Sequence, residues 1–185
     1  MTVGGLCHAA ERPVRWVVDT VAHRLHAMDG RRFSPAPTAH EPLPGGESRD
    51  LDVLVGAAEG EGFPKDVAAH VVHTYGSEAA AVIRLAQSDP HLAEPVVPGH
   101  PTLWAEILHA IRREMAITLC DLLVRRTHLF YAAPDQVLEL APAIAAFAAE
   151  HMQWDAERRE AELAAYREEV RRSIGFRDGI PETVD

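Results

Sequence analysis

The sequence predicts an all-α fold: a single irregular bundle of six to seven helices, preceded by an N-terminal helix and a linker rich in proline and glycine. Three observations support this prediction. Apolar residues recur at helical spacing in several stretches of the chain. Glycine, proline and helix-capping residues separate these stretches. No alternating pattern typical of a half-buried strand exceeds three or four residues, and the sequence contains no internal repeat.

The first element is an N-terminal helix, which we assign to residues 1–30. Its helical pattern begins near residue 11, Pro13 suits the first helical turn, and Gly30 is expected to end the helix. Residues 31–48 then contain four prolines and two glycines, which disfavour regular structure. We therefore assign this second segment to a linker and place the domain boundary there.

The helical domain is assigned to residues 49–173 and begins with a helical hairpin. A short apolar stretch, residues 51–58, comes first. Pro64 then begins a helix that Gly76 should end as a left-handed cap, and Ser77 is expected to cap the second helix of the hairpin.

A long apolar helix follows a proline-rich loop. Residues 88–101 hold four prolines, so they should form an irregular loop. Thr102 is expected to cap a helix that begins at Leu103. Thr118 either caps a second helix over residues 119–126 or lies within one continuous helix, and the sequence leaves both alternatives open.

The last helices are marked by proline and by an aspartate. A proline splits the next helical stretch into residues 136–140 and 143–152. Asp155 is a good N-cap for a final helix over residues 156–172, in which acids come early and arginines late, an order that complements the helix dipole. Residues 174–185 are assigned to a flexible tail.

The charge balance limits the class of binding partner. The chain has 18 basic and 28 acidic residues and a net charge of −10, which argues against nucleic acid or an anionic membrane surface. No segment reaches the roughly 20 apolar residues that span a bilayer, so we expect no direct membrane insertion. The first residues also lack the pattern of a secretory signal peptide.

The two cysteines indicate a reducing compartment. Cys7 and Cys120 show no pattern of a disulfide, which suits the cytoplasm. Cys120 lies among leucines, where a thiol behaves as a small apolar group and its thiolate is disfavoured. We therefore predict no nucleophilic cysteine.

Nucleotide and metal sites are both disfavoured. Residues 51–62 superficially resemble a strand and a glycine loop, but their glycines follow the spacing G-x-x-x-G-x-G, whereas a dinucleotide loop needs G-x-G-x-x-G. His70 and His73 lie three residues apart, and Glu106 with His109 forms one E-x-x-H motif. A di-iron bundle needs two such motifs, so we predict no metal site.

A stretch of interleaved charged and apolar residues covers residues 105–129. Its charged members, which we predict to form a structural network, are Glu106, Arg112, Arg113, Glu114, Asp121, Arg125 and Arg126. Asp121 and Arg125 have the i, i+4 spacing of a helical ion pair, and Glu106 lies two turns from Arg113 on a similar face. Such pairs either act as a catalytic carboxylate with an anion clamp or fix how helices cross. We favour the structural interpretation, assign no catalytic residue, and expect truncation of Asp121 or Arg125 to unfold the domain.

Several motifs in order resemble one protein family over roughly residues 50 to 170. The chain is similar to the C-terminal helical domain of the FAD-dependent, respiratory, quinone-reducing glycerol-3-phosphate dehydrogenases. The segment of residues 37–46 also resembles the linker that joins the flavin domain to this domain. The most specific matching motifs are Tyr75-Gly76, Arg113-Glu114-Met115-Ala116, Arg125-Arg126-Thr127 and Trp154-Asp155.

The resemblance implies that the chemistry lies outside this chain. In the family, the complete enzyme oxidises sn-glycerol 3-phosphate to dihydroxyacetone phosphate and passes electrons through FAD to quinone. Residues 1–28 resemble the last helix of the flavin domain, with Gly4 and Gly5 as a weak remnant of its flavin edge. The dinucleotide fold and the substrate-binding arginines are missing, so we expect no bound cofactor and no catalysis by this chain alone.

Two functions remain open. The chain is either the accessory domain of such a dehydrogenase, or a free-standing helical interaction and assembly module without a redox role. The first predicts a partner, the flavin and substrate domains of the same family in cis or in trans, and a cytoplasmic location with peripheral attachment to the inner membrane through the complete enzyme. The second predicts a homo-oligomer that is indifferent to a flavin domain.

Overall fold

The computed structural model confirms the all-α class. The described residues form eight α-helices and no β-strand, with one isolated antiparallel bridge between Pro95 and Leu103. The chain divides into two compact units, Met1–Leu43 and Pro44–Asp185, and each is described by itself. The structure describes residues 4–34, 41–48, 50–133 and 135–175, so most of the predicted tail lies outside the described residues.

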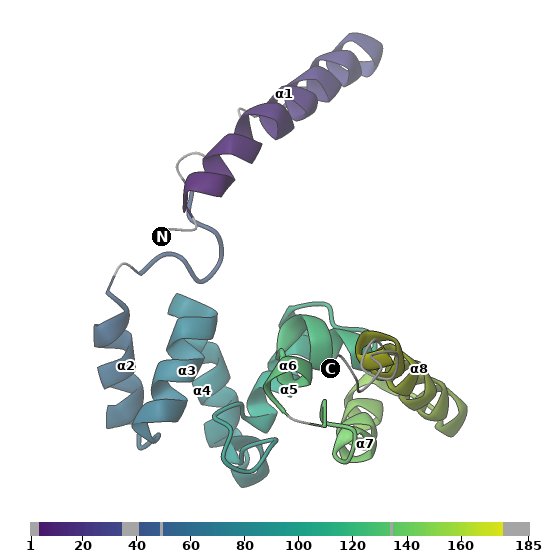
Figure 1. Cartoon of the computed structure of the whole chain (residues 1–185). Coiled ribbons are helices and arrows are strands. Elements are labelled where there is room, and N and C mark those ends of the chain that lie inside the picture. Colours follow the sequence, from purple (N-terminus) through teal and green to yellow (C-terminus); the bar gives the residue numbers. More distant parts are fainter. Residues whose placement is uncertain (1–3, 35–40, 49, 134, 176–185) are drawn as a thin grey trace, which may run out of the picture. The chain divides into compact units, whose positions relative to one another are not determined.

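The first unit contains helix α1, Gly4–Asp29 (Figure 1). The helix begins well before the predicted start near residue 11, so Pro13 lies inside it rather than in its first turn. Its end is as predicted, because Gly30 has a φ of +73° and donates its N–H to the carbonyl of His26 at 2.9 Å. Gly4 and Gly5 lie in the first turn of α1.

The second unit begins with a three-helix layer. Its elements are α2 (Leu51–Gly60), α3 (Lys65–Tyr75), the 3₁₀ turn η1 (Gly76–Glu78) and α4 (Ala79–Ser88). Helix α3 packs against both α2 and α4, which confirms the predicted hairpin, and Figure 1 shows the three helices side by side. Ser77 does not cap α4 as predicted, because η1 intervenes and the Ser77 hydroxyl donates instead to the carboxylate of Glu47.

The proline-rich loop is ordered and leads into α5, Trp104–Arg113. The 3₁₀ turn η2, Pro90–Ala93, lies within it, and the Val96 N–H donates to the Thr102 carbonyl at 2.9 Å. The N-cap of α5 is Leu103 rather than the predicted Thr102. Leu103 offers no side-chain acceptor to the first turn, but Glu106 at N3 accepts the Leu103 N–H at 2.8 Å, and the Glu106 N–H donates to the Leu103 carbonyl at 3.0 Å.

The helix is interrupted between α5 and the following helical segment. Of the two alternatives that the sequence left open, the structure therefore has two separate helices rather than one continuous helix. Met115 adopts a φ of +56°, so the helix cannot continue. Thr118 and Asp121 then form a reciprocal capping box: the Asp121 N–H donates to Thr118 Oγ1 at 3.0 Å, and the Thr118 N–H donates to Asp121 Oδ2 at 3.0 Å. The segment that they cap continues as a π-helix, η3, over Asp121–Arg126.

Three helices complete the unit: α6 (Leu129–Ala132), α7 (Ala141–Met152) and α8 (Ala156–Ile174). The predicted helix over residues 136–140 is instead a series of turns, because Gln136 and Val137 have φ values of +53° and +62°. The prediction of Asp155 as the N-cap of α8 is confirmed, since its carboxylate accepts the Arg158 N–H at 2.7 Å.

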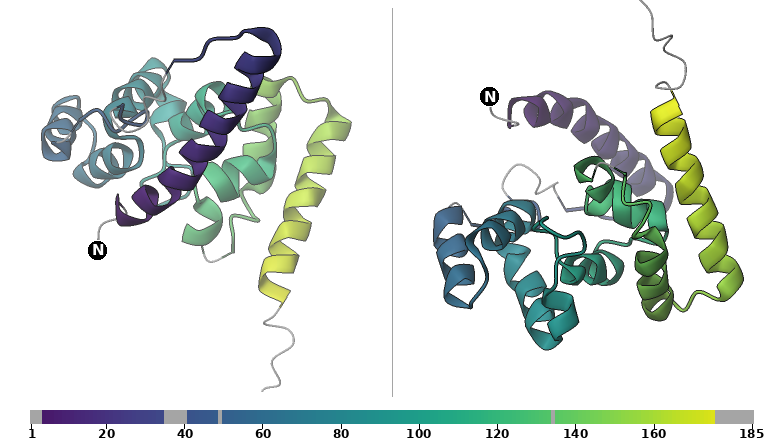
Figure 2. Two further views of the ribbon diagram at one scale, coloured as in Figure 1. Left: turned by 90° about the horizontal axis from the view of Figure 1, so that it is seen from above. Right: turned by 60° about the horizontal axis from the view of Figure 1, so that its bottom comes forward.

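The core lies where α5 passes between the three-helix layer and the pair formed by α7 and α8. Figure 2 shows α7 and α8 next to each other, and α5 contacts both α4 and α7. The largest fully buried side chains include Ile107, Leu122, Ile144 and Tyr166, from four different elements. The polar and charged residues buried with them are Thr102, Glu106, His109, Thr127 and Glu162.

Candidate functional site

The seven charges predicted as a structural network do not form one. Only one of them, Glu106, is buried, with 1% of its surface exposed. The four arginines are exposed, with Arg112 and Arg113 in the last turn of α5 and Arg125 and Arg126 at the end of η3. The exposed or half-buried members are Arg112, Arg113, Glu114, Asp121, Arg125 and Arg126.

Glu106 joins two helices through its carboxylate. It accepts the Leu103 N–H at 2.8 Å, and its other oxygen lies 3.1 Å from His70 Nε2 on α3. Thr102 Oγ1 lies 3.2 Å from the same histidine nitrogen. The predicted pairing of Glu106 with Arg113 is therefore wrong, since α5 turns Glu106 toward α3 and leaves Arg113 in solvent.

Behind this contact, Tyr75 and His109 form a buried aromatic pair. Their ring centroids lie 5.2 Å apart at 77°. Neither the Tyr75 hydroxyl nor His109 Nδ1 has a hydrogen-bond partner within the described part of the chain. Burial raises the pKa of Tyr75 far above its usual value, and the nearby carboxylates of Glu106 and Glu114 act in the same direction. Tyr75 thus stays protonated and cannot serve as a base.

These groups do not assemble a metal centre. His70 is held by Glu106, whereas His73 is exposed. His109 instead packs edge-on against Tyr75, so the E-x-x-H motif does not converge on one point. No group of three or more potential ligands occurs among the described residues. The Glu106 carboxylate is instead used to join α5 to α3 and to cap the start of α5.

A second buried glutamate was missed by sequence reasoning. Glu162 on α8 is 6% exposed and accepts the Leu119 N–H at 2.9 Å. Its other oxygen pairs with Arg158 at 2.6 Å. The carboxylate thus caps the segment that begins at Leu119 and fastens α8 to it. A signal was present, because Tyr166 and Val170 continue the same helix face at intervals of four residues.

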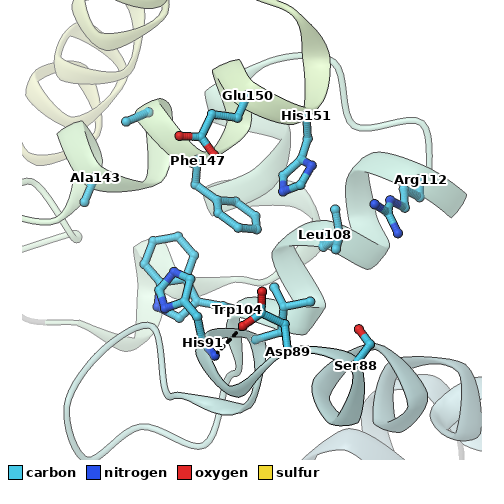
Figure 3. Close-up of a pocket in the computed structure, with 12 residues that line it drawn as sticks. Ser88, Asp89, His91, Trp104, Leu108, Arg112, Ala143, Phe147, Glu150 and His151 are labelled. Atoms are coloured by element: carbon cyan, nitrogen blue, oxygen red, sulfur yellow. Dashed lines mark hydrogen bonds between the residues drawn. The ribbon is translucent and has the colours of Figure 1, made fainter.

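A cleft of about 720 Å³ lies between the end of α4, η2, α5 and α7 (Figure 3). Trp104 and Phe147 form its aromatic wall, with ring centroids 5.0 Å apart. The Ser88 hydroxyl donates to the Leu85 carbonyl, and Asp89 accepts the His91 N–H. Both polar groups thus form hydrogen bonds within their own turns.

Two histidines near these sites resist protonation. Burial lowers the pKa of His151 in the large cleft, and the guanidinium of Arg112 adds to this, while Glu150 opposes it. Burial also lowers the pKa of His100, and His70 has the same effect. Neither histidine faces a hydroxyl or thiol in a catalytic arrangement among the described residues, so their shifted pKa values bear on stability rather than on chemistry.

A smaller cleft, of about 290 Å³, brings motif residues together. Tyr75, Arg113 with Glu114, and Arg126 come from three separate stretches of the sequence and line the same depression. These stretches are three of the four motifs that identified the resemblance. The full lining consists of Pro44, Thr74, Tyr75, Glu78, Arg113, Glu114 and Arg126.

The described residues do not fit FAD. A dinucleotide cradle needs a glycine-rich turn between a parallel strand and a helix. The stretch that superficially suggested one is helix α2, so Gly56 and Gly60 lie within helical backbone. With no strand in the described ranges, there is also no sheet edge on which a flavin nucleotide could lie.

Comparison with known proteins identifies the family. Residues 36–159 match the family described as the C-terminal domain of alpha-glycerophosphate oxidase. The chain belongs to this family. A probable mitochondrial glycerol-3-phosphate dehydrogenase of Dictyostelium discoideum is 31% identical over 126 residues, 68% of this chain and 20% of that protein. The aerobic glycerol-3-phosphate dehydrogenase of Staphylococcus aureus is 29% identical over 165 residues, 85% of this chain and 28% of that protein.

A solved structure shares the fold of this family domain. The glycerol-3-phosphate dehydrogenase of Bacillus halodurans, described as complexed with FAD, matches with a TM-score of 0.69 and 23% identity. The match covers 92% of this chain and 34% of that one. The chain spans about three tenths or less of the length of these curated relatives. Within the described ranges, no helix is both long and apolar enough to cross a membrane.

Proposed function

We propose that the chain serves as the accessory C-terminal helical domain of an FAD-dependent glycerol-3-phosphate dehydrogenase. The complete enzyme oxidises sn-glycerol 3-phosphate to dihydroxyacetone phosphate and passes electrons through FAD to quinone. It resides in the cytoplasm, peripheral to the inner membrane. The partner of this domain is the flavin and substrate body of the same enzyme, joined in cis or in trans.

The observation that carries this proposal is the family match over residues 36–159, together with described residues that form helices and no dinucleotide-binding sheet. The buried acids support it, because Glu106 and Glu162 are both used to cap helices and join elements. Neither carboxylate faces a cleft with a second catalytic group. A domain built in this way contributes packing surface to a larger enzyme rather than reacting groups.

A chimaeric enzyme tests the proposal. In it, this chain replaces the 165-residue region of the Staphylococcus aureus dehydrogenase that matches it. We expect the chimaera to retain FAD and to reduce a dye with glycerol 3-phosphate, whereas the body without any C-terminal region loses FAD or activity. The chain alone, mixed with FAD and substrate, should show no turnover. A chimaera no better than the shortened body would overturn the proposal.

A second candidate is a free-standing assembly module that forms a homo-oligomer. Helix α1 favours it, because Trp16, Val17, Val18 and Val21 are all at least half exposed. An apolar helix face of this kind suits association with a second copy. Light scattering coupled to gel filtration decides between the two: a stable dimer that ignores the dehydrogenase body favours assembly, and a monomer that restores activity favours the accessory domain.

A further inference from the structure

The small cleft holds charges that are left unpaired. Arg113 and Arg126 line it together with Glu78 and Glu114, yet none of the four has an ion-pair partner in the part of the chain that the structure describes. Arg125, by contrast, pairs with Asp121 at 2.7 Å. The cleft is thus lined by two guanidinium groups and two carboxylates that form no ion pairs among the described residues, an arrangement that suits charged groups from outside the domain.

Next to these charges, the chain exposes apolar side chains at a strained turn. Met115 is 84% exposed and has a φ of +56°, a strained backbone conformation for a residue other than glycine. Ile117 is 65% exposed. Ala116 between them is buried, and its N–H donates to the Ala110 carbonyl at 3.2 Å. The turn is thus held in place while its apolar side chains remain uncovered.

The cleft also lies where the chain enters the domain. Pro44 is part of its lining, and the next residue, Gly45, is fixed to the start of η1 by the Ser77 N–H at 2.9 Å. In a family whose members carry this region as a C-terminal domain, the remainder of the protein precedes it. The 13 residues between Gly30 and Pro44 can span at most about 45 Å, which limits how far that remainder can lie from Pro44.

We infer that Arg113, Met115, Ile117 and Arg126 form a docking surface for the flavin-containing body of the same enzyme. This inference rests on the proposed function. The complementary site on the body carries carboxylates that pair with the two arginines around an apolar recess that receives Met115. The unpaired charges, the uncovered apolar turn and the entry point of the chain coincide at this surface. The docking surface also explains why three family motifs meet at a place without catalytic groups.

Photo-crosslinking in the chimaera locates the contact. A benzophenone amino acid at Met115 should crosslink to the dehydrogenase body, whereas the same probe at Val53 should not. Val53 is a matched control because it is 65% exposed, lies on α2 and does not line the small cleft. Mass spectrometry of the crosslinked peptides identifies the recess. Crosslinks from Val53 but none from Met115 would overturn the docking surface.

Charge reversal of neighbouring arginines supplies a second measurement. Arg112 and Arg113 are adjacent and exposed on α5, but they line different clefts. We expect Arg113→Glu to reduce the Met115 crosslink about tenfold and Arg112→Glu to leave it nearly unchanged. Equal effects would contradict the inference. If the chimaera is active and contains FAD but the two substitutions change the crosslink equally, only the docking surface is rejected. If the chimaera has no activity, the proposed function is rejected, and this inference with it.

Discussion

The backbones of Gly45 and Gly76 lie in direct contact, and neither residue has room for a Cβ atom. Such an atom on Gly76 would overlap the carbonyl oxygen of Gly45, and one on Gly45 would lie 2.6 Å from the carbonyl oxygen of Tyr75. Gly76 also has a φ of +57° and a ψ of −129°, a region that is essentially restricted to glycine. The pair fastens the end of the linker to the end of α3.

This contact predicts a large effect for the change Gly76→Ala. Backbone strain and the overlap with Gly45 should lower the free energy of unfolding by roughly 2–3 kcal/mol, as measured by urea denaturation. Gly56→Ala is the matched control, because Gly56 lies inside α2 with open space around it. There the change should raise stability by about 0.5–1 kcal/mol. Equal shifts in the two variants would show that the contact is not formed.

The buried carboxylate of Glu106 predicts a different kind of loss. Glu106→Ala leaves the Leu103 N–H without its acceptor and His70 without its partner, and it opens a cavity. We expect a cost of about 3 kcal/mol in unfolding free energy. Glu106→Gln keeps one oxygen acceptor and should cost about half as much. A thermal shift for Glu106→Ala within error of the wild type would contradict the arrangement at the start of α5.

Asp121 and Arg125 should respond unequally to truncation, although the sequence led us to expect that either change unfolds the domain. Arg125 is 62% exposed, so Arg125→Ala should cost less than about 1 kcal/mol. Asp121 closes a capping box with Thr118, so Asp121→Ala should cost about 1–2 kcal/mol. Paired urea titrations measure both. A cost for Arg125→Ala that equals or exceeds the Asp121→Ala cost would reverse this assignment.

The contribution of Asp121 to stability should also depend on pH. Burial alone would raise its pKa, but hydrogen bonds from Thr118, Ile117 and Arg125 outweigh burial and lower the pKa below its usual value. A carboxyl with a depressed folded-state pKa stabilises the fold above its unfolded pKa of about 3.9, and that contribution disappears as the pH falls further. The stability difference between wild type and Asp121→Asn should therefore narrow below about pH 4.

Local signals in the sequence located some of the helix ends. Gly30 and Asp155 act where the sequence placed them, because each uses only groups within a few residues. The interruption of the helix at Met115 was not predicted, because a methionine gives no indication of a positive φ. The turns at Gln136 and Val137 were missed for the same reason, and a hydrogen bond from the distant Tyr166 hydroxyl to the Gln136 carbonyl accompanies them.

The contacts that define the candidate sites were harder to predict because they join distant segments. Glu106 meets His70, which lies 36 residues earlier, and Glu162 reaches Leu119, which lies 43 residues earlier. Periodicity indicates that a helix face is buried, but it does not identify the backbone group that a buried carboxylate caps. The sequence also made the stretch of mixed charges appear to be one network, because it does not show that α5 and η3 turn their arginines to the surface.

His100 and His151 predict that the fold weakens in mild acid. Burial lowers the folded-state pKa of both histidines. For His100, nearby His70 lowers the pKa further and Glu106 opposes the shift. For His151, Arg112 lowers the pKa further and Glu150 opposes the shift. The unfolded chain therefore binds more protons below its histidine pKa of about 6.5. Stability should fall as the pH drops through that value and level off once the folded-state histidines are also charged.

Thermal melts between pH 8 and pH 5 measure this effect. The melting temperature should decline below about pH 6.5, and the variants His100→Gln and His151→Gln should each flatten the decline because they remove one titrating group. His73→Gln is the matched control, since His73 is exposed and pairs with no described residue. If His73→Gln flattens the profile as much as the other two, the acid sensitivity arises elsewhere. A profile that rises toward pH 5 would contradict the direction of both pKa shifts.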